Sequence, residues 1–296
     1  MVVFASPRKL PKPASLEGRV AVLDIAFAAT GTGTSYEKVT GAFLQGLGPR
    51  LAAWIDHHDH EMHARFAGDP RFVLRKKSEH GGCPEMVTPD RVAAAGPVDT
   101  VVCHDDLDGL YSAAKFLRDG VEPYPGADAD ARAVDTRMGT PSALGRTIDF
   151  ALRARPRDFT LRERVVWFLV DGAQNILVRE DLEAVATEFA ANEAGARKLA
   201  EGYVLRGRLA VVDATGFAKR EGPYDKTLAL LLGQERAAIA VVYDDMTVSI
   251  AAAFDSGIDL LVLLGVSGGM PTRVSVPRPR LDDVLRLLET QSTSSS

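Results

Sequence analysis

The chain has 296 residues and a formal net charge of −5, from 35 Lys and Arg against 40 Asp and Glu. Hydrophobic residues make up 46% and charged residues 25%, a composition typical of soluble globular proteins with one large core or two smaller ones. The acidic balance argues against a protein that coats nucleic acid along its whole length, but it leaves room for a local basic groove.

The N-terminus shows no secretory signal pattern, and the longest apolar runs, such as residues 260–264, are far short of a membrane span. The only cysteines, Cys83 and Cys103, are too few for a disulfide scaffold, which favours a reducing compartment. We interpret Cys103 as a buried strand residue. We therefore expect a cytoplasmic protein that does not act in a membrane.

The first half of the chain alternates between apolar runs and polar turns. Residues 1–18 contain several prolines and basic residues, and we expect them to be poorly ordered. Thr34 and Glu37 have capping-box spacing, which predicts a helix that continues to about Leu47. The apolar residues in 109–117 have helical spacing, and the predicted helix ends before Gly120. The predicted strands are 19–27, 51–55, 71–74 and 98–103.

Strand, acidic turn and helix recur in this half, a pattern that predicts an α/β fold with a mainly parallel sheet. Ligands of such open sheets bind outside the carboxyl ends of the strands. Asp24 lies near the end of the first expected strand, and two polar clusters directly follow later strands. We therefore expect these side chains to converge.

The second half begins with helical patterns at 142–154 and at 161–200, the latter interrupted near 171–174. The periodicity then changes, and residues 238–243 and 247–252 are expected to form a hairpin. The expected organisation is a poorly ordered segment at 1–18, a first domain with a helical connector at 19–205, a smaller C-terminal α/β domain at 206–290 and a disordered tail at 291–296.

All six histidines fall between positions 57 and 104, inside two acid-rich clusters. The clusters are residues 54–61 and 103–109, and each follows a predicted strand. Imidazole together with carboxylate suits a divalent transition metal, and several carboxylates suit a pair of ions. The alternative is a pair of solvated polar loops, but scattered surface histidines do not concentrate in this way.

These clusters resemble motifs of the DHH phosphoesterase superfamily, which includes RecJ-type exonucleases, nano-RNases, exopolyphosphatases and family II pyrophosphatases. Residues 106–114 are similar to its first motif, and residues 22–24 to its second. The triplet 56–58 is similar to the third, and 134–136 to the fourth. The order departs from the family's pattern, because the first motif follows the other two along the chain. The sequence therefore resembles a circularly permuted member.

The resemblance implies a pair of metal ions. His104 and Asp106 would hold one ion, Asp108 would hold the other, and Asp24 would bridge them. His57 and Asp135 would complete the second site, with Asp171 as the alternative to Asp135. Two ions about 3.5–4 Å apart need a bridging carboxylate and activate a bound water. The mixture of imidazole and carboxylate favours Mn²⁺, with Mg²⁺ as the alternative.

Roles are also expected for residues that lie near these metal ligands in the sequence. Asp56 is expected to orient a histidine, and His58 to point at the substrate phosphate. His60 and His63 are expected on the surface of a following helix. His80 lies in a glycine-rich turn, where it either contacts substrate or is a simple loop residue.

The resemblance extends to residues 267–273, which are similar to the glycine-rich loop of the family's C-terminal domain. Gly268 and Gly269 permit close approach of the backbone to an anion, and Arg273 adds a bidentate phosphate contact. An ordinary tight turn is the alternative.

The resemblance thus implies a phosphoesterase that hydrolyses phosphodiester or phosphoanhydride bonds with a water activated by two metal ions. Its expected partner is a short oligonucleotide, a nucleic-acid end or another phosphate-containing small molecule. The alternatives are a non-catalytic nucleotide-binding or regulatory protein on the same fold, and an inorganic pyrophosphatase or exopolyphosphatase. For the oligomeric state, a homodimer is one option.

Overall fold

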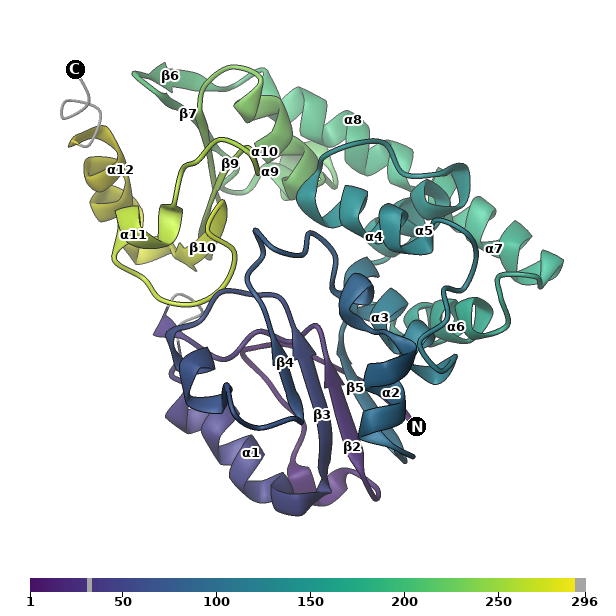
Figure 1. The fold of residues 1–296 in the computed structure, drawn as a ribbon. Coiled ribbons are helices and arrows are strands. Elements are labelled where there is room, and N and C mark those ends of the chain that lie inside the picture. The colour runs from purple at the N-terminus through teal and green to yellow at the C-terminus, as the bar shows by residue number, and fades with distance from the viewer. Residues whose placement is uncertain (31–33, 291–296) are drawn as a thin grey trace. The chain divides into compact units, whose positions relative to one another are not determined.

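The computed structural model describes residues 1–30 and 34–290 and has the predicted mixed α/β architecture, here with two five-stranded sheets (Figure 1). The chain divides into two compact units, of which the first contains Met1–Ala28 and Thr34–Thr187. The second contains Ala29, Thr30 and the described residues from Glu188 onward, so the boundary predicted at 205/206 lies within its range. The predicted tail, 291–296, lies outside the described residues.

The first sheet is entirely parallel, with the strand order β1-β5-β2-β3-β4. Its central strands pair in a register that matters for the site, because Leu23 of β2 lies opposite both Cys103 of β5 and Ile55 of β3. The strands are β1 (Val2–Ala5), β2 (Val20–Leu23), β3 (Leu51–Asp56), β4 (Phe72–Leu74) and β5 (Thr100–His104).

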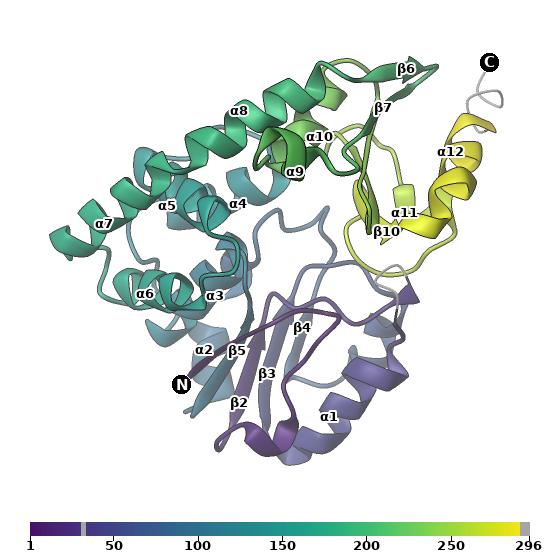
Figure 2. The ribbon, with the colours of Figure 1, turned by 180° about the vertical axis from the view of Figure 1, so that it is seen from behind.

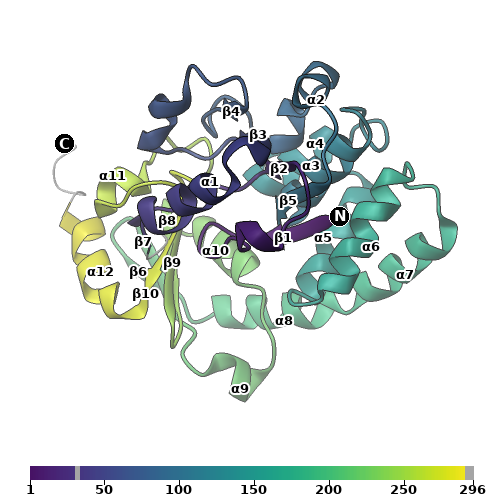
Figure 3. The same ribbon diagram turned by 90° about the horizontal axis from the view of Figure 1, so that it is seen from below.

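Both faces of this sheet are buried, as a parallel sheet requires. Leu23 and Cys103 pack on one face, in a core shared with Leu110 of α3 (Leu107–Leu117). Val22 and Trp54 pack on the other face, against α1 (Ala42–Leu47). Figures 1 and 3 show α1 and α3 on opposite sides of the sheet. The remaining α-helices of the unit are α2 (Pro89–Ala95), α4 (Ala127–Thr136), α5 (Ala143–Ala154), α6 (Phe159–Val170) and α7 (Ile176–Thr187).

The prediction that residues 1–18 are poorly ordered is wrong for the first of them. Val2–Ala5 forms the edge strand β1, which pairs in parallel with β5, and the Met1 ammonium donates to the carbonyl of Asp99. The physical reason is that β5 would otherwise expose an unpaired edge with its backbone N–H and C=O groups.

Two other predicted elements differ in extent from the observed ones. The strand expected at 19–27 is regular only over Val20–Leu23, and a π-helical turn at Glu37–Gly41 precedes α1. The helical region expected at 161–200 is broken near residues 171–174, as predicted, and again near residue 188, where α8 (Phe189–Ala200) begins.

The second unit contains a mixed sheet of order β10-β9-β8-β7-β6, in which β8 and β9 form the predicted antiparallel hairpin. One face packs against α8 and α10, and the other against α11 and α12 (Figure 2). The strands are β6 (Val204–Arg206), β7 (Leu209–Asp213), β8 (Ile239–Tyr243), β9 (Thr247–Ala252) and β10 (Arg273–Pro277). The helices are α9 (Phe217–Glu221), α10 (Lys226–Gln234), α11 (Leu260–Leu264) and α12 (Leu281–Thr290).

Among the described residues, no helix combines the length and the apolar character that a membrane crossing demands.

Candidate metal centre

The candidate site lies where the three central strands of the first sheet end. Leu23 is opposite both Cys103 and Ile55, so the next residue, Asp24, follows level with the ends of β5 and β3. Those ends carry His104 and Asp56, and because the strands are parallel all of these residues emerge at the same edge of the sheet. The predicted convergence is thus a consequence of strand register.

Asp24 leaves its strand in the left-handed conformation, with a φ of 56°. Its N–H donates to the carbonyl of Ile55 at 2.9 Å, so the turn is held by the neighbouring strand. A non-glycine residue in this region costs about 1–3 kcal/mol, although aspartate tolerates it better than most. The turn leaves the buried Asp24 Oδ1 3.2 Å from His57 Nε2. Strain of this kind is typical of functional sites.

The beginning of α3 supplies two more carboxylates. Asp106 is the N-cap and accepts from the N–H of Gly109 through Oδ1, while its Oδ2 lies 2.8 Å from His104 Nδ1. Asp108 Oδ2 accepts from the N–H of Cys83 at 3.0 Å. Glycine is required at 109, because a Cβ there would lie 2.4 Å from the carbonyl oxygen of His104.

The donor atoms of the centre form three groups, within each of which one ligand atom per residue lies within 4.8 Å of the others. Asp24 and His57 each belong to two groups, so the groups share members and form one continuous centre. The groups are Asp24–His104–Asp106, His57–Asp108–Asp135 and Asp24–His57–His58.

The centre fits a divalent cation electrostatically. Asp108 Oδ1 is buried, and within the described part of the chain no hydrogen-bond donor reaches it. Burial, followed by the negative charges of Asp108 and Asp106, raises the pKa of Asp24 to about 8. Carboxylates that crowd each other in this way are stabilised by a cation, and the mixed nitrogen and oxygen donors suit a first-row transition ion.

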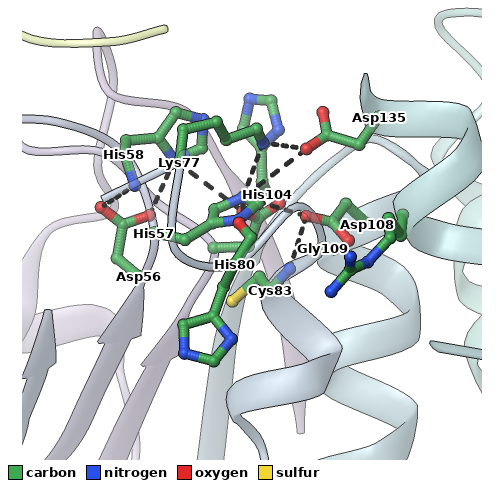
Figure 4. A network of polar contacts seen from close by, with 12 residues as sticks. Asp56, His57, His58, Lys77, His80, Cys83, His104, Asp108, Gly109 and Asp135 are labelled. Atoms are coloured by element: carbon green, nitrogen blue, oxygen red, sulfur yellow. Dashed lines mark hydrogen bonds and ion pairs between the residues drawn. The ribbon is translucent and has the colours of Figure 1, made fainter. Parts of the chain in front are cut away.

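Asp56 and His58 form a separate pair at the edge of the centre (Figure 4). His58 Nδ1 lies 2.8 Å from Oδ1 of the fully buried Asp56. Burial lowers the pKa of His58, against the opposing effect of Asp56, so the imidazole is neutral at neutral pH. A carboxylate only accepts hydrogen bonds, so the proton resides on Nδ1 and Nε2 keeps its lone pair.

His57 is oriented by a main-chain group. Its Nδ1 donates to the carbonyl oxygen of His80 at 2.8 Å, which leaves Nε2 facing the carboxylates of Asp24 and Asp108. The His80 side chain points away from the cluster in Figure 4, and its Nδ1 lies 3.6 Å from Glu85 Oε2. The contact of His80 with substrate stays a prediction, whereas its carbonyl contact to His57 is a role that the sequence did not indicate.

Asp135, in the last turn of α4, joins the centre. Its competitor Asp171, which caps the C-terminus of α6, is in none of the donor groups found among the described residues.

Lys77 is the residue that the sequence analysis missed. Its side chain is only 2% exposed, and Nζ lies 2.8 Å from His57 Nε2 and pairs with Asp135 Oδ2. Lys77 ends the basic run Arg75-Lys76-Lys77, which has the pattern of a solvated surface. The one available signal was its position just after β4, at the same edge of the sheet as the histidine clusters.

His60 and His63 are half-buried packing residues, so the expectation that they lie on the surface is wrong. His63 packs edge-on against the buried ring of Phe27 at 5.1 Å, and His60 packs against the same ring at 5.6 Å. Each imidazole presents a flat, largely apolar face that can cover an aromatic core residue.

The glycine-rich loop lies in the second unit. Gly268 and Gly269 have positive φ values of 72° and 117°, which non-glycine residues rarely adopt. Arg273 begins β10 and donates through Nη2 to Thr227 Oγ1 at 2.8 Å. Phosphate binding by this loop stays a prediction.

No family model and no curated protein matches the chain. Among solved structures, the chain is similar to a pGpG-specific phosphodiesterase, PggH from Vibrio cholerae, with 12% identity and a TM-score of 0.40. The similarity covers 95% of this chain and 100% of that chain. At this level the likeness carries no argument about function, which therefore rests on the residues of the centre.

Metal affinity should rise with pH between 6 and 8. The pKa of Asp24 is raised to about 8, and that of His104 to about 10, because the effect of Asp106 outweighs that of burial. Both groups therefore hold protons at pH 7, which a bound ion must displace, and affinity should rise about tenfold per pH unit for each proton released. Calorimetry of Mn²⁺ binding in buffers of different ionisation enthalpy counts these protons, and a pH-independent affinity would contradict the expectation.

Proposed function

We propose that the protein is a divalent-metal-dependent phosphoesterase of the DHH type, which hydrolyses phosphodiester or phosphoanhydride bonds. The observation that carries the proposal is the meeting of Asp24, His104 and Asp106 in one donor group, beside a second group that includes His57 and Asp108. These residues come from separate segments of the chain, and they are the ones that the motif resemblance implies. If these segments were only solvated loops, nothing would bring their side chains together.

The donor set holds a divalent ion through carboxylate oxygens and imidazole nitrogens, which favours Mn²⁺ over Mg²⁺. When bound, such an ion supplies Lewis acidity toward a phosphoryl oxygen and toward water. Asp24 is the central ligand in this proposal, since it belongs to the group with His104 and to the group with His57. His57 Nε2 is aimed inward because its other nitrogen is tied to a backbone carbonyl.

His58 and Asp56 carry the proton transfer in this proposal. The neutral His58 has its Nδ1 proton directed to Asp56, so Nε2 is free to accept a proton from the attacking water. The buried Asp56 carboxylate stabilises the imidazolium that results. The leaving oxygen departs on the opposite side of the phosphorus and takes its proton from solvent. His58 is part-exposed, which suits contact with a substrate phosphate.

The substrate class in the proposal is a short oligonucleotide, a nucleic-acid end or a small phosphate compound. The net charge of −5 disfavours tracking along long single strands, which depends on extended basic surfaces. Gly268, Gly269 and Arg273 are proposed to bind a phosphate of the substrate through backbone N–H groups and a guanidinium.

A substrate screen with the purified protein and Mn²⁺ tests the class of reaction. Pyrophosphate, polyphosphate, cyclic dinucleotides and labelled oligonucleotides of graded length are offered side by side. Cleavage of short oligonucleotides supports the proposal, and hydrolysis of pyrophosphate alone favours a pyrophosphatase. Binding of nucleotides without any hydrolysis would replace the enzyme with a regulatory protein.

The variant Asp106→Asn should lower Mn²⁺-dependent hydrolysis more than about a hundredfold, because even the partners of metal ligands contribute about 10–100-fold. Asparagine keeps the side-chain oxygen that caps α3, so the melting temperature of the metal-free protein should hardly change. Asp90→Asn, which removes an exposed carboxylate in the first turn of α2, is the control. Equal turnover in Asp106→Asn and the wild type would remove Asp106 from the centre.

The variant Arg273→Ala should raise KM for an oligonucleotide about tenfold, the effect of losing a charge-assisted hydrogen bond. KM for a small chromogenic phosphodiester should change less, since that ester lacks a remote phosphate. Arg286→Ala, on α12 of the same unit, is the matched control. The same increase for both substrates would show that the loop does not bind the remainder of the substrate.

A further inference from the structure

A lysine lies inside the second donor group of the centre. Lys77 Nζ is 2.8 Å from His57 Nε2 and pairs with Asp135 Oδ2, and both of these atoms belong to the group His57–Asp108–Asp135. The side chain is buried, and Figure 4 shows it reaching across the centre to Asp135. The ammonium therefore occupies space among donors that a metal ion would use.

The first donor group differs in this respect. Within residues 1–30 and 34–290, no lysine or arginine side chain hydrogen-bonds to or pairs with Asp24, His104 or Asp106. Those three donors face one another, and in the described part of the chain no ammonium or guanidinium lies between them. The two groups are thus unequal, although the motif resemblance implies an ion in each.

We propose that the Lys77 ammonium takes the place of the second cation, so that the centre binds one divalent ion, at Asp24–His104–Asp106. This inference rests on the proposed function, which supplies the metal. An ammonium has no lone pair to share with a metal, and it competes for the lone pair of His57 Nε2 and for the carboxylate of Asp135. Two cations at contact distance in a buried site also repel each other strongly.

Lys77 is also held in place. Its backbone N–H donates to Asp59 Oδ2 at 3.3 Å, and its buried ammonium has a carboxylate partner in Asp135. A buried ammonium that moves away from its partner loses that pairing and leaves an uncompensated carboxylate behind. Displacement of Lys77 by an incoming ion therefore requires the buried ammonium to give up its carboxylate partner.

An ammonium in place of a second metal ion changes the chemistry that is available at that position. An ammonium stabilises negative charge on a phosphoryl oxygen and donates hydrogen bonds to it, but it does not acidify water as a metal does. In the proposed reaction the single divalent ion would acidify the water, and Lys77 would neutralise negative charge on the phosphoryl group.

Counting bound Mn²⁺ tests the inference without reference to activity. Titration calorimetry and metal analysis of the purified full chain should give one ion per chain for the wild type. Lys77→Ala removes the ammonium and opens its space, so it should bind two ions, and Mn²⁺ electron paramagnetic resonance should then show the spectrum of a coupled pair. Lys77→Arg keeps a cation there and should bind one.

The matched control is Lys115→Ala. Lys115 is likewise buried and paired with a carboxylate, Asp128, but it contacts no member of the donor groups. The Lys115→Ala variant should bind one ion per chain, like the wild type. If Lys77→Ala does not fold, Lys77→Ser takes its place, and the wild-type count remains decisive.

The outcomes separate the inference from the function on which it rests. Two ions in the wild type, or one ion in a folded Lys77→Ala, would overturn the inference and leave a metal-dependent phosphoesterase intact. No bound ion in the wild type would overturn the metal centre and the inference together. One ion in the wild type and two in Lys77→Ala, with no hydrolysis of any phosphate compound, would support the inference and reject the phosphoesterase.

Discussion

The parallel pairing of β2 with β5 and β3 is the constraint on which the candidate centre depends. Side chains alternate between the faces of a sheet, so a register slip of one residue would turn the strand-end residues to opposite sides. With Leu23 opposite Cys103 and Ile55, the residues that follow are brought level, and Asp24 lies between the segments that carry His104 and His57. The apolar side chains that fix this register lie in two cores, one on each face, and neither core includes a residue of the three donor groups. The geometry of the site is therefore set by hydrophobic packing.

The buried carboxylates of the centre also require charge compensation, and they do not receive it equally. Asp24, Asp56 and Asp108 are buried, and an uncompensated buried carboxylate is strongly destabilising. Asp56 accepts a hydrogen bond from the neutral His58, and Asp135 pairs with the ammonium of Lys77. Asp24 shares its imidazole partner, His57, with Asp108, and its pKa is raised to about 8 by burial and by the charges of Asp108 and Asp106. A cation that binds beside Asp24 relieves this repulsion only in the folded state, so it stabilises the fold by mass action.

Much of the centre could be predicted from the sequence, because its residues follow apolar strands and carry side chains of one chemical kind. The choice of Asp135 over Asp171 rested on the motif resemblance alone, since both lie at the ends of helical segments and only the packing of α4 brings Asp135 near the centre. Lys77 was hidden by its sequence neighbours, because a basic run is the usual pattern of a solvated surface. The edge strand at Val2–Ala5 pairs with a segment almost a hundred residues away, and no local pattern encodes such a partner.

Main-chain groups hold most of the proposed ligands before any ion arrives. Asp106 is fixed by the N–H of Gly109, Asp108 by the N–H of Cys83 and His57 by the carbonyl of His80, while Asp24 is fixed by its own left-handed backbone. Backbone contacts of this kind persist when a ligand's charge is removed but its shape is kept. Such a change therefore acts on the affinity for a cation and leaves the fold in place. A centre that was organised only by its ion would lose both together, because metal binding and folding would then be one event.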